Sequence, residues 1–142
     1  MKYFTIKELT SSHTAKKLNI DNTPSEEIKE RLIYLIESTL DPIREAFGAP
    51  IVITSGYRCE LLNKACGGSK TSHHTKGIAV DMDTDDNAKL WDTIINSGLQ
   101  WTQLINENPN DEGVPSWVHI SVDPNNLKNE ILIYKNNKYT RI

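Results

Sequence analysis

Three side chains in two short stretches of the sequence are of the types that bind a divalent metal ion. His74 and Asp81 lie in Ser-His-His-Thr-Lys-Gly-Ile-Ala-Val-Asp, and His119 lies in Ser-Trp-Val-His-Ile-Ser. Two imidazoles and one carboxylate form a nitrogen/oxygen ligand set that suits zinc with its fourth position open to water. An open position is typical of catalytic zinc sites, whereas structural sites use four protein ligands.

Strand periodicity would bring two of these ligands to one face of a sheet, and His74 would lie in the loop before the first of the two strands. A strand over residues 77–82 points its even-numbered apolar residues to the core and Asp81 to the opposite face, and a strand over 117–122 does the same for His119. His74 and Asp81 are too far apart for one helix face, since helical ligands recur every three or four residues. From patterning alone, two ordinary surface or core histidines explain the sequence equally well.

Two motifs in the same order give the sequence a family resemblance. They are Ser-x-His-x-x-Gly-x-Ala-x-Asp at residues 72–81 and Trp-Val-His at 117–119. With Ile-Thr-Ser-Gly-Tyr-Arg at 53–58 and the stretch from Leu62 to Gly68, the chain resembles the zinc D-Ala-D-Ala carboxypeptidase and L-alanyl-D-glutamate peptidase family, whose fold is shared with hedgehog signalling domains. The likeness covers nearly the whole chain and is strongest to small peptidases of phages and prophages.

The resemblance implies that His74, Asp81 and His119 bind zinc and that a nearby carboxylate takes a proton from the activated water. Many family members carry that acid three residues before the last histidine, where this chain has Ser116. Glu107 is the first choice as substitute, because it would end the strand that precedes the histidine strand. Glu112, in the following loop, is the second, and an exposed acid without a role is the alternative for either.

Arg58 is expected to hold a substrate carboxylate or to stabilise the oxyanion formed during hydrolysis. The alternative is a surface arginine, or one paired with Asp41 or Glu45. Ser72 is expected to hydrogen-bond a ligand or the substrate. Trp117 would be an apolar wall beside the last histidine, or part of the core.

Two cysteines and a second histidine offer different chemistry. Cys59 and Cys66 are expected to be reduced, partly buried thiols, although a small-loop disulfide is also compatible with their spacing. One thiol with His73 or His74 could form a cysteine-protease pair, and all four residues could form a closed structural zinc site. Such a zinc site would leave Asp81 and His119 without a role. His73 is otherwise assigned to the surface or to support of the ligands, and the segment 60–68 to one wall of a cleft.

Capping and periodicity predict the helices that must support this site. A short helix is expected from Thr5 toward Lys17, and a weaker one over residues 84–97. The clearest helix begins at Thr23-Pro24-Ser25-Glu26, with the threonine as cap, and Pro42 should kink it or split it before Gly48 ends it. Its buried stripe is Ile28, Leu32, Leu35, Ile36, Leu40, Ile43 and Phe47.

Five segments favour β-strands: residues 51–54, 78–82, 101–105, 117–122 and 131–134. Helices gathered before and between such strands predict an α+β fold of the hedgehog/DD-peptidase type, with N-terminal helices packed on a small, mainly antiparallel sheet. The length of 142 residues fits one domain over 1–142.

Composition excludes one class of partner. Sixteen basic and nineteen acidic side chains give a net charge of −3, which argues against a nucleic-acid binder. No apolar run is long enough to span a membrane, and the first residues lack the apolar core of a secretory signal, so synthesis in the cytoplasm and no membrane partner are expected. A monomer is expected.

The expected function is that of a Zn2+-dependent peptidase that hydrolyses an amide bond in the peptide stem of bacterial peptidoglycan. It would be of the D-Ala-D-Ala carboxypeptidase or L-Ala-D-Glu endopeptidase type. The missing secretory signal, taken with this substrate, points to a phage or prophage endolysin, which would reach the wall only after the inner membrane is permeabilised. A phage tail-associated enzyme or a host housekeeping enzyme is the alternative for the cellular role. The alternative is a non-catalytic, zinc-containing binding or structural domain of the same fold, which the serine at 116 keeps open.

Overall fold

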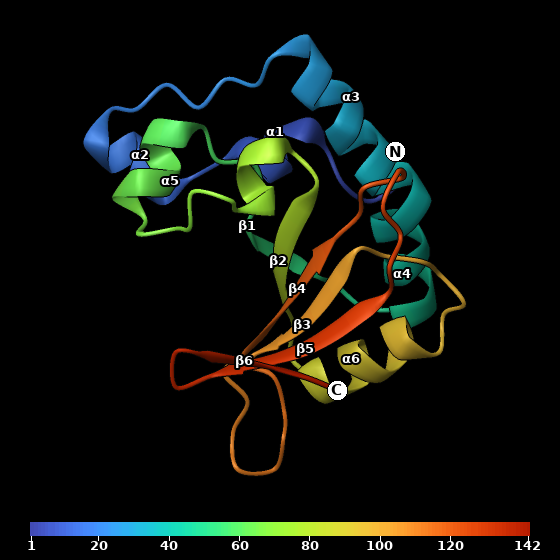
Figure 1. The fold of residues 1–142 in the computed structure, drawn as a ribbon. Coiled ribbons are helices and arrows are strands. Elements are labelled where there is room, and N and C mark those ends of the chain that lie inside the picture. The colour runs from blue at the N-terminus through green and yellow to red at the C-terminus, as the bar shows by residue number, and fades with distance from the viewer.

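Several of the helices pack against one face of a six-stranded sheet in the computed structural model, which describes residues 1–142 (Figure 1). No helix combines the length and the apolar character needed to cross a bilayer. The helical elements are α1 (Ile6–Thr10), α2 (His13–Leu18), α3 (Glu26–Leu35), the π-helical turn η1 (Ile36–Leu40), α4 (Asp41–Phe47), α5 (Glu60–Ala65), the 3-10 turn η2 (His73–Lys76) and α6 (Asn87–Ile95).

The N-terminal segment forms two helices where the sequence predicts one. Thr5 caps α1 as expected, since its hydroxyl accepts a hydrogen bond from the backbone N–H of Glu8. Ser12 then caps a separate helix by accepting from the N–H of Ala15. A second residue able to cap, six positions after α1 begins, therefore divides the segment.

The main helix begins at Ser25 and not at Thr23, so the predicted cap is wrong by two residues. Ser25 accepts from the N–H of Ile28, while the Thr23 hydroxyl donates to Asp21. The predicted effect of Pro42 is confirmed, because α3 passes through the wider η1 before α4 begins. Gly48 ends α4 in the left-handed conformation, with φ of 75°.

The strands are β1 (Val52–Ser55), β2 (Ala79–Asp83), β3 (Gln103–Glu107), β4 (Trp117–Ser121), β5 (Glu130–Lys135) and β6 (Lys138–Arg141). Their order in the sheet is β1-β2-β4-β3-β5-β6. All neighbours are antiparallel except β3 and β5, which are parallel. The predicted α+β fold with a mainly antiparallel sheet is confirmed.

Strand β6 is the one strand that sequence patterns did not predict. It follows a two-residue turn at Asn136 and Asn137, both with positive φ, which is the conformation of a tight β-hairpin turn. Every residue of β6 is exposed, so no alternation of apolar and polar residues marks it. The Asn-Asn pair was the signal that could have revealed it.

The core lies between the helices and one face of the sheet. It contains 18 buried residues and takes Val80 and Met82 from β2, Leu104 from β3, and Val118 and Ile120 from β4. The predicted alternation is therefore confirmed in β2 and β4. The opposite face of the sheet is turned away from this core and carries the site described next.

A candidate metal centre in a cleft of the sheet

Paired residues form rows across the face of the sheet opposite the core. Asp81 on β2 pairs with His119 on β4, which pairs with Ile105 on β3. A parallel row begins at Trp117 on β4 and continues through Glu107 on β3. Because paired side chains in neighbouring strands point to the same face, Glu107 and Trp117 lie one step from the His119 row.

The structure brings His74, Asp81 and His119 together around one point. Oδ1 of Asp81 lies 3.0 Å from Nδ1 of His119 and 3.4 Å from Nε2 of His74. One donor atom from each residue lies within 4.8 Å of the other two. Ligands held about 2.0–2.2 Å from a tetrahedral zinc ion would be roughly 3.3–3.6 Å apart, so this donor set fits a metal after only small adjustments.

Gly56 orients the first of these histidines. Nδ1–H of His74 donates to the carbonyl oxygen of Gly56 at 2.8 Å, which leaves Nε2 free to face Asp81. A Cβ at position 56 would lie 2.1 Å from the carbonyl oxygen of Leu9, so only glycine fits here. Helix α1 therefore fixes the position of the carbonyl that orients His74.

The pKa of Asp81 depends on the two histidines beside it. Burial acts to raise the pKa of Asp81, but hydrogen bonds and charge from His119 and His74 outweigh it and hold this pKa well below its usual value. Burial lowers the pKa of His119, and the nearby Asp81 opposes that shift. An ionised Asp81 and a neutral His119 are the protonation states that metal binding requires.

Glu107 lies at the end of β3, half-buried in the same cleft. Burial, followed by the negative charge of Asp81, raises the pKa of Glu107 to about 7, while a hydrogen bond with Trp117 opposes the shift. A pKa near neutrality suits a group that must both accept and return a proton. The sequence-based choice of Glu107 therefore falls on a carboxylate with suitable placement.

A cleft of about 1020 Å³ surrounds these residues. Its lining includes all three metal-binding candidates and the four remaining predicted site residues, which are Arg58, Ser72, Glu107 and Trp117. The residues after α5, Cys66 to Gly68, also line it, in agreement with the wall expected there.

Arg58 and Ser72 differ in how they are held. Nε of Arg58 is buried and has no hydrogen-bond partner. The two acids that could have paired with Arg58 are engaged elsewhere: Asp41 accepts from the backbone N–H groups of residues 2 and 3, and Glu45 pairs with Lys2. Ser72 caps η2 by accepting from the N–H of His74, so it positions a candidate ligand.

Glu112 and the two cysteines are the other residues for which the sequence offers a role. Glu112 is exposed in the loop between β3 and β4 and does not line the cleft. Cys59 and Cys66 are both free thiols, and neither belongs to a cluster of possible metal ligands, which excludes the closed four-ligand zinc site. Cys66 is exposed and not partly buried as expected, while Cys59 caps α5 through its sulfur.

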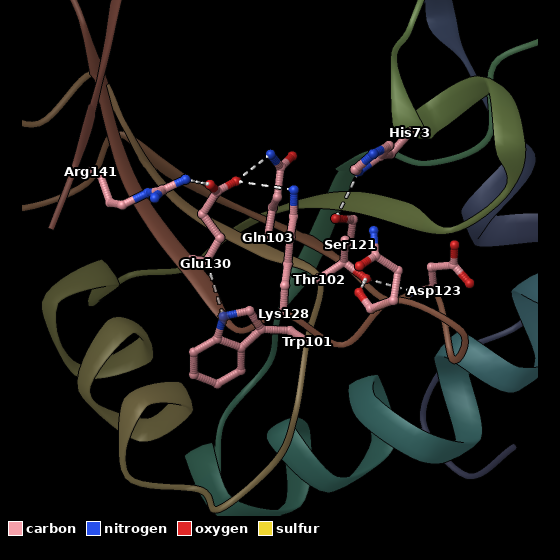
Figure 2. Close-up of polar contacts among 10 residues, drawn as sticks. His73, Trp101, Thr102, Gln103, Ser121, Asp123, Lys128, Glu130 and Arg141 are labelled. Atoms are coloured by element: carbon pink, nitrogen blue, oxygen red, sulfur yellow. Dashed lines mark hydrogen bonds and ion pairs between the residues drawn. The ribbon is translucent and has the colours of Figure 1, made fainter.

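A polar row flanks the candidate ligands on the side away from Glu107, and the sequence predicted it only in part, through the supporting role considered for His73. In Figure 2, His73 lies above Ser121, and Nδ1 of His73 is 2.9 Å from Oγ of Ser121. The side-chain amide of Gln103 donates a hydrogen bond to the carboxylate of Glu130. Burial, followed by the charge of His119, lowers the pKa of His73 to about 4, so this ring is neutral at pH 7. Ser121 lies two residues after His119 on β4 and pairs with Gln103 on β3. Strand alternation therefore places both side chains on the cleft face, and this alternation is visible in the sequence.

The second missed feature is the contribution of β5 and β6 to the cleft. Leu132, Tyr134, Asn137 and Tyr139 all line it. Tyr134 pairs in register with Glu107 on one side and with Tyr139 on the other. The row that begins at Trp117 and Glu107 therefore continues into the C-terminal hairpin.

Comparison with known proteins supplies one match. No protein with a curated description matches the sequence. The profile of the family Peptidase M15 matches residues 2–121, which include the three candidate ligands and Glu107. This range covers most of the chain, all of its helices and four of its strands. The chain belongs to the peptidase M15 family.

Proposed function

We propose that this protein is a zinc-dependent peptidase that hydrolyses an amide bond in the peptide stem of bacterial peptidoglycan. Family membership supports peptidase activity on such peptides. The observation that carries the proposal is the convergence of His74, Asp81 and His119 in an open cleft that also contains Glu107. Three protein ligands with an open fourth position, next to a carboxylate, are typical of hydrolytic zinc sites.

The residues of the cleft have separable roles in this proposal. A bound zinc ion would supply a Lewis acid for the substrate carbonyl and would activate a water molecule. Glu107 accepts the proton of the attacking water and passes it to the leaving nitrogen, for which a pKa near neutrality is suitable. Arg58 donates hydrogen bonds to a substrate carboxylate or to the developing oxyanion. Ser72 and Trp117 line the same cleft and contact the substrate.

A non-catalytic binding domain is the second candidate, and Ser116 is the observation that favours it. Ser116 is exposed and its hydroxyl donates to the carbonyl oxygen of Asn108, so it can neither accept nor return the reaction's proton. The binding-domain hypothesis fails if Glu107 supplies the missing carboxylate. The test must therefore separate metal binding from turnover.

Glu107→Gln is the variant that makes this separation. It should retain zinc, measured by mass spectrometry of the native protein, and lower amine release from purified peptidoglycan by about a hundredfold or more, because a general base contributes on that scale. Glu112→Gln, the same change in an exposed loop, is the matched control and should hydrolyse at the wild-type rate. Full activity of Glu107→Gln would remove Glu107 from the mechanism. A zinc-loaded wild-type protein that releases no amine from any peptidoglycan would establish the binding domain.

The cellular role that we propose is that of an endolysin, on the basis of the resemblance to phage peptidases. In this role the enzyme acts on the wall only after the membrane has been permeabilised. Bacteria that produce the protein in their cytoplasm should therefore keep their turbidity until chloroform opens the inner membrane, and should then lyse. Lysis at the same rate without chloroform would contradict the proposal.

A further inference from the structure

Two tyrosines of the C-terminal hairpin extend the cleft beyond the catalytic residues. The hairpin comprises β5, the turn at 136–137 and β6, and it lies outside the residues 2–121 that match the family. Its Tyr134 and Tyr139 are cross-strand partners, and Tyr134 also pairs with Glu107. These two side chains therefore share the cleft face with Glu107 and line the same cavity.

The two rings form an exposed platform that the core does not explain. Their centroids are 4.5 Å apart with the planes tilted by 47°. Tyr139 remains 57% exposed although it is a large aromatic residue on an edge strand. Neither ring belongs to the buried core. An exposed aromatic pair on the wall of a cleft is a feature of ligand recognition more than of folding.

Polar groups surround this platform on the hairpin. The hydroxyl of Tyr134 donates to Oδ1 of Asn137 at 3.2 Å, and the side chain of Asn137 lines the cleft. Aromatic faces with an amide and hydroxyl groups at their edges match a ligand that has an apolar face and a polar rim. A pyranose ring has this chemistry, because its C–H groups can pack on an aromatic face while its hydroxyl and acetamido groups form hydrogen bonds.

We propose that the hairpin β5–β6 binds the amino-sugar ring to which the stem peptide is attached, with Tyr139 and Tyr134 as the stacking platform. This inference rests on the proposed peptidase function, and it names the part of the substrate that the hairpin recognises.

Strand spacing places the platform within reach of a stem peptide held at the metal centre. β4, β3 and β5 are neighbours, so two strand spacings, about 10 Å, separate the strand of His119 from that of Tyr134. An extended stem peptide advances about 3.5 Å per residue, so about three of its residues span this distance. The sugar and the stem peptide can therefore occupy the platform and the metal centre at the same time.

The test compares hydrolysis of one stem peptide with and without its N-acetylmuramyl sugar. Tyr139→Ala should lower kcat/KM on the sugar-bearing peptide by about three- to tenfold, which is the scale of one aromatic contact. On the free peptide it should change kcat/KM by less than twofold. Tyr139→Trp should restore the preference for the sugar. Tyr34→Ala, a change of an exposed tyrosine on α3, is the matched control and should alter neither rate.

A binding measurement separates this inference from the proposed function. The peptide-free disaccharide of the glycan should shift backbone amide NMR signals of the hairpin in wild-type protein and not in Tyr139→Ala. Equal loss of kcat/KM on both substrates, or no shift with the disaccharide, would overturn the sugar subsite. Disaccharide shifts at the hairpin without any peptide hydrolysis would support the subsite while refuting the peptidase.

Discussion

At Glu107, burial favours a neutral carboxyl group, whereas the proposed catalytic role requires a carboxylate that accepts a proton. Glu107 lies half-buried between Trp117 and Tyr134 in register, and its pKa is raised to about 7. A raised pKa means that the folded state favours the protonated carboxyl. Ionisation of Glu107 therefore costs stability as the pH rises above the unfolded value of 4.5, and the whole cost is present above pH 7.

Substitution of this carboxyl should stabilise the metal-free protein at alkaline pH. At pH 8, Glu107→Gln should raise the free energy of unfolding by about 1–2 kcal/mol, less than the full pKa shift implies because the side chain is partly exposed to solvent. At pH 4 both proteins carry a neutral group and should unfold alike. Urea denaturation at the two pH values measures the difference. Equal stability of the wild type and Glu107→Gln at pH 8 would show that solvent stabilises the ionised carboxylate in the folded protein.

Asp81 and His119 could be assigned to one face of the sheet from strand alternation, whereas His74, in the turn η2 before β2, was assigned from its motif. Strand alternation also located Trp117 and, with the preceding strand, Glu107. The Gly56 carbonyl that orients His74 could not be predicted, because it depends on the approach of α1 to the loop after β1. Contacts between backbone atoms of distant segments leave no pattern in side-chain types.

At the scale of elements, Asn22 connects the N-terminal helices to the loop that carries Arg58. Its amide nitrogen donates to the carbonyl oxygens of Thr10 and Tyr57, both at 2.9 Å, and its Oδ1 accepts from the N–H of Cys59 at 2.7 Å. Asn22 is 9% exposed, so these partners cannot readily exchange to water. One side chain therefore holds the loop on both sides of Arg58.

Asn22→Ala should lower the free energy of unfolding by about 1–3 kcal/mol, because it leaves buried backbone groups without partners. It should also lower kcat on peptidoglycan peptides, since the loop positions both Arg58 and the Gly56 carbonyl. Urea denaturation and steady-state kinetics measure the two effects. Asn125→Ala, at an exposed asparagine, is the control and should behave as wild type in both. Wild-type stability of Asn22→Ala would mean that the loop is held without this side chain.

Element prediction succeeded where burial imposes a periodicity. The main helix and strands β2 and β4 have one core face each, so their apolar spacing is readable in the sequence. It failed at local choices between similar caps, as at Thr23 and Ser25, and at β6, where full exposure removes the alternation. The parallel pairing of β3 with β5 also required long-range contacts that single-sequence patterns do not encode.

For the whole molecule, metal binding should be coupled to stability. The candidate ligands come from η2, β2 and β4, and an unfolded chain does not hold them together. Zinc at a hundred times its Kd should stabilise the fold by about 2.7 kcal/mol, which corresponds to a rise in Tm on the order of 8 °C. Differential scanning calorimetry with and without a chelator measures this shift.

The shift should disappear in Asp81→Asn, which removes the charged ligand while keeping the shape of the side chain. His13→Ala is the matched control, because His13 is exposed at the start of α2 and should leave the zinc-dependent rise unchanged. A full rise in Asp81→Asn would place the ion elsewhere on the protein.

The position of the tyrosine platform on the outermost strands has a consequence for redesign. Two of the ion-binding candidates, Asp81 and His119, lie on inner strands of the sheet, whereas β6 has only one neighbour and follows a two-residue turn. Changes there disturb no buried packing, so the tip of this hairpin is a suitable place to graft loops from other enzymes. Retargeting to a different cell-wall chemotype would then require new residues at 134–139 while the reactive centre stays intact.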